Sequence, residues 1–217
     1  DYSLARIRCR ISEHNSTRIL KLLGEIKAYV KKNIDPGLTV RITSYPVIYS
    51  NMVDSMAHGQ IKNLIFVYAA LFLLTVIYFR SFTIGALAIV PNVIPILFTF
   101  GFMGFTGISL NMGTTMISGI AIGLAMDDTT HFFDRFQIEQ PLHPDYSDNM
   151  GHTYLLLGNT MIFSSLIMIS TYLVLALSQF RLTVLFGLLC ALTTFVALLC
   201  DMFITPWILI TFKPKFK

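Results

Sequence analysis

The stretch that decides the fold reads GIAIGLAMDDTTHFFDRF and covers residues 119–136. Its first part is apolar and carries two glycines four residues apart, Gly119 and Gly123, and Asp127 continues that spacing. Residues at this spacing lie on one face of a helix. Glycines on such a face allow a second helix to approach closely, so we expect Gly119 and Gly123 to pack against a neighbouring helix near Asp127.

Asp127 and Asp128 are the residues of this stretch that point to chemistry. An ionised, unpaired carboxylate at membrane depth costs several kcal/mol, and intramembrane acids mark proton pathways by default. Two adjacent carboxylates also repel each other, so we expect one to hold a proton near neutral pH and to release it when its surroundings open. We therefore predict a proton relay at Asp127 and Asp128, with Asp127 pointing into a helix interface. The alternative is that both acids are solvated at the end of a span.

Other polar residues are weaker candidates for the same relay. We take as its candidate helpers Thr130, His131, Thr160, Ser164 and Asp201. The hydroxyl groups among them also suit plain helix packing, and Asp201 could instead ease a bend near Pro206. The sequence has no phosphate-binding glycine loop, no GxSxG, no HExxH and no metal-ligand spacing. We predict no cofactor, no metal site and no enzymatic activity.

The composition excludes an ordinary soluble domain. Of the 217 residues 54 % are hydrophobic and only 13 % are charged, against about 25 % charged residues in soluble domains. The net charge of +4 does not indicate a nucleic-acid partner, because no basic stripe interleaved with aromatic residues occurs. The basic tail 213–217 follows an apolar segment, which is typical of a cytoplasmic anchor.

Five apolar segments each provide the roughly 20 residues that cross about 30 Å of hydrocarbon. Their expected bounds are 62–79, 83–105, 112–133, 154–177 and 182–211. The fold class is therefore an α-helical polytopic membrane protein with a transmembrane domain over 62–212. The positions of Arg80, Arg135 and the terminal lysines place the loop 134–153 and the C-terminus in the cytoplasm and the N-terminal part outside. We expect a partial surface helix in that loop.

The first 61 residues have a different pattern. Alternating apolar residues predict strands over 5–11 and 38–43, and a helical stripe with late lysines lies between them. Residues 1–45 thus read as a partial β-α-β, ferredoxin-like unit. Residues 46–61 read as an amphipathic helix that leads into the membrane. We expect the chain to be the C-terminal part of something larger.

The order of these parts resembles the C-terminal half of an exporter of the resistance-nodulation-division (RND) superfamily, in its MMPL-like branch for hydrophobic and amphiphilic compounds. The motifs that carry the resemblance are FRS at 79–81, VPNVIPILFTFGFMGFTGISLNM at 90–112, GLAMDDTTHFF at 123–133 and CDMFITPWIL at 200–209. The resemblance implies a proton-driven secondary transporter in the inner (plasma) membrane that exports lipids or similar compounds. It maps the family's proton relay onto Asp127 and Asp128.

The resemblance also implies partners. Residues 1–45 would belong to a porter domain outside the membrane, and the N-terminal half of the transporter would complete the transport path. Membrane lipids, a hydrophobic substrate and further copies in a dimer or trimer are the other expected partners. The alternative hypothesis is a non-transporting sterol-sensing or assembly scaffold, in which the acids only pack helices.

Overall fold

The computed structural model describes residues 7, 16–35, 37–42, 45–108, 110 and 112–214. The chain divides into two compact units, Asp1–His58 and Gly59–Lys217. The helix α2 (Tyr45–Phe79) begins in the first unit and continues in the second. Residues 46–61 and 62–79, which the sequence separated, therefore belong to one helix.

The first unit contains α1 (Ser16–Asn33), in which Ile19 and Leu23 are buried. The chain turns after α1, where Asp35 Oδ1 accepts a 2.9 Å hydrogen bond from the N–H of Gly37. The predicted strand 38–43 is wrong over its described part, because residues 38–42 form no strand. An extended segment becomes a strand only when its backbone pairs with a neighbour, and no strand occurs among the described residues. Of the other predicted strand, 5–11, only Ile7 lies within them.

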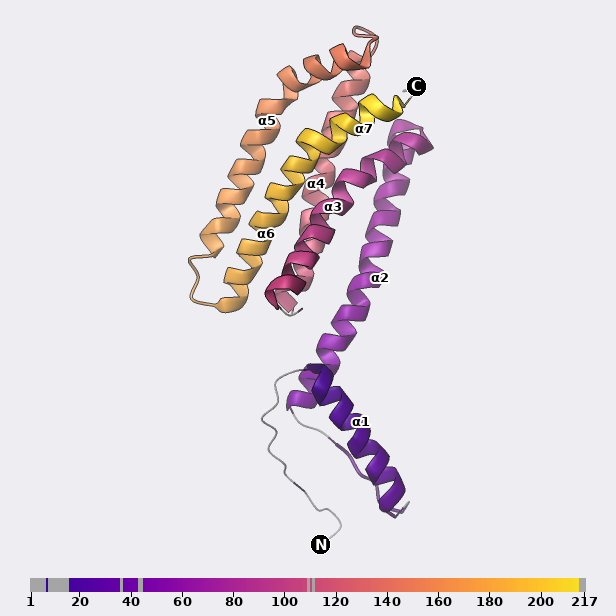
Figure 1. Ribbon diagram of the computed structural model, residues 1–217, viewed down its shortest axis with the longest axis vertical. Helices are drawn as coiled ribbons and strands as arrows, with labels where there is room; N and C mark the ends of the chain where they lie inside the picture. The colour runs from indigo at the N-terminus through magenta and orange to yellow at the C-terminus, as the bar shows by residue number, and fades with distance from the viewer. Residues whose placement is uncertain are drawn as a thin grey trace. The chain divides into compact units, whose positions relative to one another are not determined.

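The second unit is a bundle of helices (Figure 1). After α2 come α3 (Phe82–Thr106), α4 (Met112–Glu139), α5 (Tyr146–Leu175), α6 (Arg181–Leu199), the π-helical turn η1 (Cys200–Ile204) and α7 (Thr205–Phe212). The helix α6 packs against α3, α4 and α5, and α4 packs against α3 and α5. The loop between α4 and α5 lies at the same end of the bundle as the C-terminus, the upper end in Figure 1.

Local sequence explains the sharp turn between α2 and α3. Arg80 takes a left-handed conformation with a φ of 50°, and the side chain of Ser81 caps α3 by accepting from the N–H of Ile84. Gly85 then allows close packing of α3 on α2, because a Cβ at this position would collide with Val76. The two prolines within α3, Pro91 and Pro95, leave carbonyl groups of the preceding turns without a backbone donor.

Among the described residues, four helices are long and apolar enough to cross a membrane: Asp54–Phe79, Phe82–Thr106, Tyr146–Leu175 and Arg181–Phe212. The sequence predicted five, and α4 is the helix that does not meet this criterion. Its polar residues lower its hydropathy, among them Thr114, Ser118 and the pair Asp127–Asp128. Thr114 and Ser118 are buried within the bundle and Asp128 contacts α5, whereas Asp127 lies on an exposed face.

Candidate functional site

Three successive residues of α4 point in three different directions. Asp127 lies on an open face, and its side chain is 73 % exposed. Asp128 points toward α5, where Ser165 donates a 3.4 Å hydrogen bond to its Oδ2. Thr129 is fully buried on the side of α3 and η1. This divergence follows from the helical turn of about 100° per residue, and it gives the two carboxylates different surroundings.

Asp127 has few partners within the chain. The imidazole of His131 lies one helical turn away, with Nε2 3.5 Å from Oδ1 of Asp127. The hydroxyl of Thr130 turns back to its own helix and donates to the carbonyl of Met126 at 2.6 Å. We expected Asp127 to point into a helix interface, but no described helix of this chain forms that interface. Within the described residues, the helices that pack on α4 contact its other faces.

The two glycines near the relay share this open face. A Cβ built on Gly119 or Gly123 would meet no atom within 4 Å, so neither glycine packs closely against another described helix. The close helix approach predicted from their spacing is thus absent from the described part of the chain. Gly119, Gly123 and Asp127 together form a stripe of α4 that is accessible to another polypeptide; we call it the open stripe.

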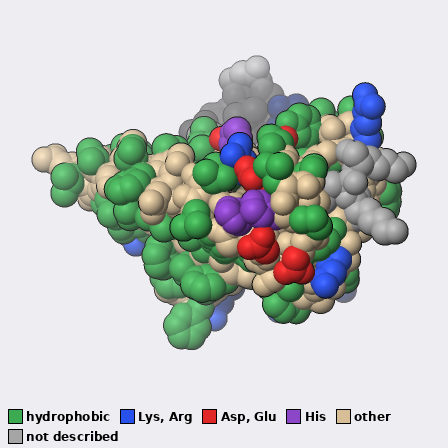
Figure 2. All heavy atoms as spheres, turned by 90° about the horizontal axis from the view of Figure 1, so that it is seen from above, with side chains coloured by type: hydrophobic (Ala, Val, Ile, Leu, Met, Phe, Trp, Pro, Cys, Tyr) green, Lys and Arg blue, Asp and Glu red, His purple; other side chains and the backbone are tan. Residues whose placement is uncertain are grey.

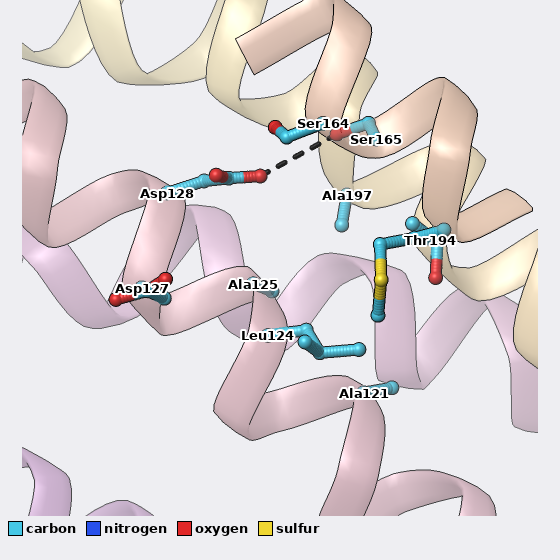
Figure 3. Close-up of a pocket in the computed structure, with 10 residues that line it drawn as sticks. Ala121, Leu124, Ala125, Asp127, Asp128, Ser164, Ser165, Thr194 and Ala197 are labelled. Carbon is cyan, nitrogen blue, oxygen red and sulfur yellow. Dashed lines mark hydrogen bonds between the residues drawn. The ribbon is translucent and has the colours of Figure 1, made fainter. Parts of the chain in front are cut away.

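The carboxylate pair lines a small pocket of about 200 Å³ between α4, α5 and α6 (Figure 3). Its polar lining consists of Asp127, Asp128, Ser164, Ser165 and Thr194, and the remaining lining residues are apolar. Figure 3 shows the side chain of Asp128 directed toward Ser165, and no hydrogen bond joins Asp127 to the other residues drawn there. The pocket therefore gives the inner carboxylate a hydroxyl partner and a partly apolar environment.

A third carboxylate, Asp201, lies inside the bundle and is only 2 % exposed. Its Oδ1 accepts hydrogen bonds from Thr129 at 2.6 Å and from Thr205 at 3.2 Å. Thr129 belongs to α4, so this contact joins α4 to the last membrane helix. Hydrogen bonds of this kind compensate for part of the free energy that burial of a carboxylate costs.

The helix around Asp201 is locally widened into the π-helical turn η1. Pro206 has no N–H and cannot donate to the carbonyl of Met202, four residues earlier. The hydroxyl of Tyr154 on α5 donates to that carbonyl instead. Single π-helical turns occur frequently at functional sites, and this one places a buried acid next to a carbonyl that a neighbouring helix satisfies.

Asn92 extends the network to α3. Its amide nitrogen donates to the hydroxyl of Thr129 at 3.0 Å and to the carbonyl of Ala88 at 2.8 Å. Its carbonyl oxygen is buried and has no hydrogen-bond partner among the described residues. Side chains from α3, α4 and η1 thus meet at Thr129.

The structure brings together some of the predicted relay residues and separates others. Asp127, Asp128 and Ser164 line one pocket, and Asp201 is joined to Thr129, the neighbour of Asp128. Thr160 is exposed and is not among the residues that line the pocket. Sequence reasoning assigned no relay role to the four residues that complete the network, which are Asn92, Thr129, Ser165 and Thr205. The sequence offers a signal for one of the four: Thr205 follows Asp201 by four residues, a spacing that places two residues on the same face of a helix.

Two comparisons with known proteins indicate the family of the chain. The sequence model of the MMPL family matches residues 9–213. A curated membrane protein of Methanocaldococcus jannaschii is 22 % identical over 142 residues, a stretch that covers 64 % of this chain and 37 % of that protein. The family match confirms the resemblance to the MMPL-like branch, and the matched part of the chain spans well under half the length of the relative.

Proposed function

Because the chain belongs to the MMPL family, we propose that it forms the C-terminal half of an RND-type secondary transporter. In this proposal the transmembrane proton gradient drives the export of hydrophobic or amphiphilic compounds such as lipids. The observation that supports it most is the presence of three carboxylates on apolar helices of the bundle: Asp201 is buried, Asp128 is half-buried, and Asp127 lies on the open stripe. Such residues are costly at membrane depth and mark ion pathways.

We further propose that α4 is a fifth membrane crossing. Its 28 residues give a length of about 42 Å, more than the hydrocarbon thickness of about 30 Å. It also runs alongside α3 and α6 in the bundle (Figure 1). An odd number of crossings puts the N-terminal part and the C-terminus on opposite sides of the membrane, with the C-terminus in the cytoplasm.

In the proposed relay Asp127 takes up the proton at the open face and Asp128 lies next in line, in the pocket that Ser165 completes. Protonation removes the charge that membrane burial penalises, so each carboxylate alternates between two states that favour different surroundings. An ionised carboxylate only accepts hydrogen bonds, whereas a protonated one can also donate one. Movement of α4 relative to α5 would couple proton transfer to export.

The N-terminal half of the transporter is the proposed partner of the open stripe. Asp127 is mostly exposed, and both glycines of the stripe leave room for a closely packed helix. A helix on this stripe would remove Asp127 from lipid and water and would complete the site.

A non-transporting scaffold remains the second candidate, and one observation favours it. Asp201 already accepts two threonine hydrogen bonds, as a residue with a purely structural role would. A transporter of this kind uses the proton gradient, whereas a scaffold does not.

Reconstitution of the full-length protein distinguishes them. Proteoliposomes that contain a fluorescent phospholipid analogue would be given a pH gradient, and export of the analogue would be followed with and without a protonophore. The transporter predicts export that stops when the protonophore is added. A scaffold predicts no effect of the gradient, and that result would overturn the proposal.

A further inference from the structure

A second cluster of titratable side chains lies where the loop after α4 meets the start of α5, separate from the carboxylates of the bundle. The sequence shows no familiar metal-ligand spacing in this loop, but the fold brings His143, Asp148 and His152 together. One potential ligand atom from each of the three lies within 4.8 Å of the others. Figure 2 views this end of the structure and shows histidine and acidic side chains gathered on its surface.

The two carboxylate oxygens of Asp148 face the two imidazoles. Oδ2 lies 2.7 Å from Nδ1 of His143, and Oδ1 lies 4.0 Å from Nε2 of His152. The imidazole rings are stacked, with their centroids 3.7 Å apart and an angle of 18° between their planes. Neutral imidazole is the form that binds a metal ion.

The backbone around the cluster is fixed by its own hydrogen bonds. The N–H of His143 donates to the carbonyl of Glu139 at 2.9 Å, which continues the last turn of α4. The side chain of the buried Asn149 donates to the carbonyl of Phe136 and to Gln140 Oε1, both at 3.0 Å, and thereby ties the start of α5 to the end of α4. The potential ligands are therefore held on two helix ends that are already joined.

We propose that His143, Asp148 and His152 form a binding site for a divalent transition-metal ion of the zinc class. Zn²⁺ is commonly bound by histidine nitrogen and aspartate oxygen at about 2.0–2.2 Å, which puts neighbouring ligand atoms about 3.3–3.5 Å apart. The distances of 2.7 Å and 4.0 Å lie on either side of this value. Binding of one ion requires the two imidazoles to leave their nearly parallel stacking, so that their in-plane nitrogen lone pairs converge, and requires the exposed Asp148 carboxylate to rotate toward the ion.

The donor set also indicates which ions bind. Two imidazoles suit Zn²⁺, Co²⁺ and Ni²⁺, whereas Mg²⁺ and Ca²⁺ prefer oxygen ligands alone. Three protein ligands leave a fourth position open to water. The bound ion would connect the end of α4 with the beginning of α5, the two helices that carry Asp128 and Ser165. The site does not depend on proton-driven export, because its three residues lie in the loop after α4 and at the start of α5, apart from the carboxylates of the proposed relay.

Metal titration of the full-length protein tests the site. The protein would carry a purification tag without histidine, would be stripped with a chelator and would be titrated with Co²⁺ and Zn²⁺. Competition with an indicator gives the Zn²⁺ affinity, and visible absorption reports Co²⁺ coordination. We expect His143→Gln and His152→Gln each to weaken binding by about 100-fold or more, because even the loss of a residue that only supports a ligand costs 10–100-fold.

His58→Gln is the matched control, because His58 also faces an aspartate one helical turn away, Asp54, at 3.6 Å. This pair belongs to no cluster of three potential ligands among the described residues, so the control should bind as the wild type does. A second measurement needs no variant: Zn²⁺ should slow amide hydrogen exchange over 141–152 in the wild type, and Mg²⁺ at the same concentration should not. Equal binding by the wild type and both ligand variants, or exchange unaffected by Zn²⁺, would overturn the proposal.

Discussion

The hydroxyl of Thr129 on α4 donates a 2.6 Å hydrogen bond to Oδ1 of Asp201 in η1. The residue directly after the carboxylate pair is thereby joined to the third carboxylate of the bundle. Because Asn92 on α3 donates to the same threonine at 3.0 Å, three elements depend on one buried hydroxyl group. A change in the charge of Asp201 therefore alters the hydrogen bonding of α4 beside the proposed relay.

Replacement of Thr129 by valine tests this connection. Thr129→Val keeps the shape of the side chain but leaves Asp201 with one donor fewer and leaves the Asn92 amide without this acceptor. We expect the free energy of unfolding to fall by about 1–3 kcal/mol and gradient-driven export to fall with it. Thr129→Ser retains the hydroxyl and should stay close to the wild type in both. Unfolding in detergent would measure stability, and a valine variant as stable and active as the serine variant would contradict the assignment.

The contact between Tyr154 and Met202 leads to a second prediction. Tyr154→Phe removes the side-chain donor to the Met202 carbonyl, and Pro206 has no N–H to replace it, so this change should cost about 1–3 kcal/mol of stability. In Tyr154→Phe/Pro206→Ala the alanine N–H can donate to that carbonyl. A double-mutant cycle of unfolding free energies should therefore give a coupling of at least about 0.5 kcal/mol. Strict additivity of the two changes would show that the carbonyl is not the shared partner.

A third prediction concerns the packing of α6 on α5. A Cβ at Gly187 would lie 2.5 Å from the carbonyl oxygen of Tyr172 and 2.8 Å from Cβ of Leu175, so the two helices would have to separate. Gly187→Ala should lower stability by about 1–3 kcal/mol, measured as a lower midpoint of thermal unfolding. Gly101 has open space around its Cβ direction, and Gly101→Ala should leave the midpoint unchanged or raise it. Equal midpoints would argue against this helix contact.

Much of the bundle follows from residues that act locally. Arg80 and Ser81 interrupt the apolar pattern between α2 and α3, and Gly107 ends α3 in a left-handed conformation with a φ of 70°. Long apolar runs predict helices because a membrane accepts few other structures. The strand predicted over 38–43 failed for a different reason. Alternation in the sequence indicates a strand only where a partner provides backbone hydrogen bonds.

The site was less predictable than the helices. Asp127 and Asp128 stand out in any apolar segment, but their opposite environments depend on where α5 and α6 pack. Thr129 and Asp201 are far apart in the sequence, so only the fold reveals that they are hydrogen-bonded. The π-helical turn also has no clear local signature, because Pro206 alone is equally compatible with a simple kink.

The open stripe of α4 gives a fourth prediction. If a helix of the N-terminal half packs on this stripe, Gly123→Leu in the full-length protein should prevent its close approach and abolish export. Gly104 on α3 likewise has open space in the direction of its Cβ, and Gly104→Leu is the control, with export expected close to that of the wild type. Export and membrane insertion would be measured for both variants. Loss of export in both, or in neither, would contradict a specific partner for the stripe.

One substitution tests whether export requires Asp127 to bind and release a proton. Asp127→Asn keeps the size and polarity of the side chain but cannot bind and release a proton. The measurement is export of a fluorescent phospholipid analogue from proteoliposomes under an imposed pH gradient, with membrane insertion checked in parallel. We predict that the variant inserts normally and loses gradient-driven export. Export at the wild-type rate by the inserted variant would contradict a proton relay at Asp127.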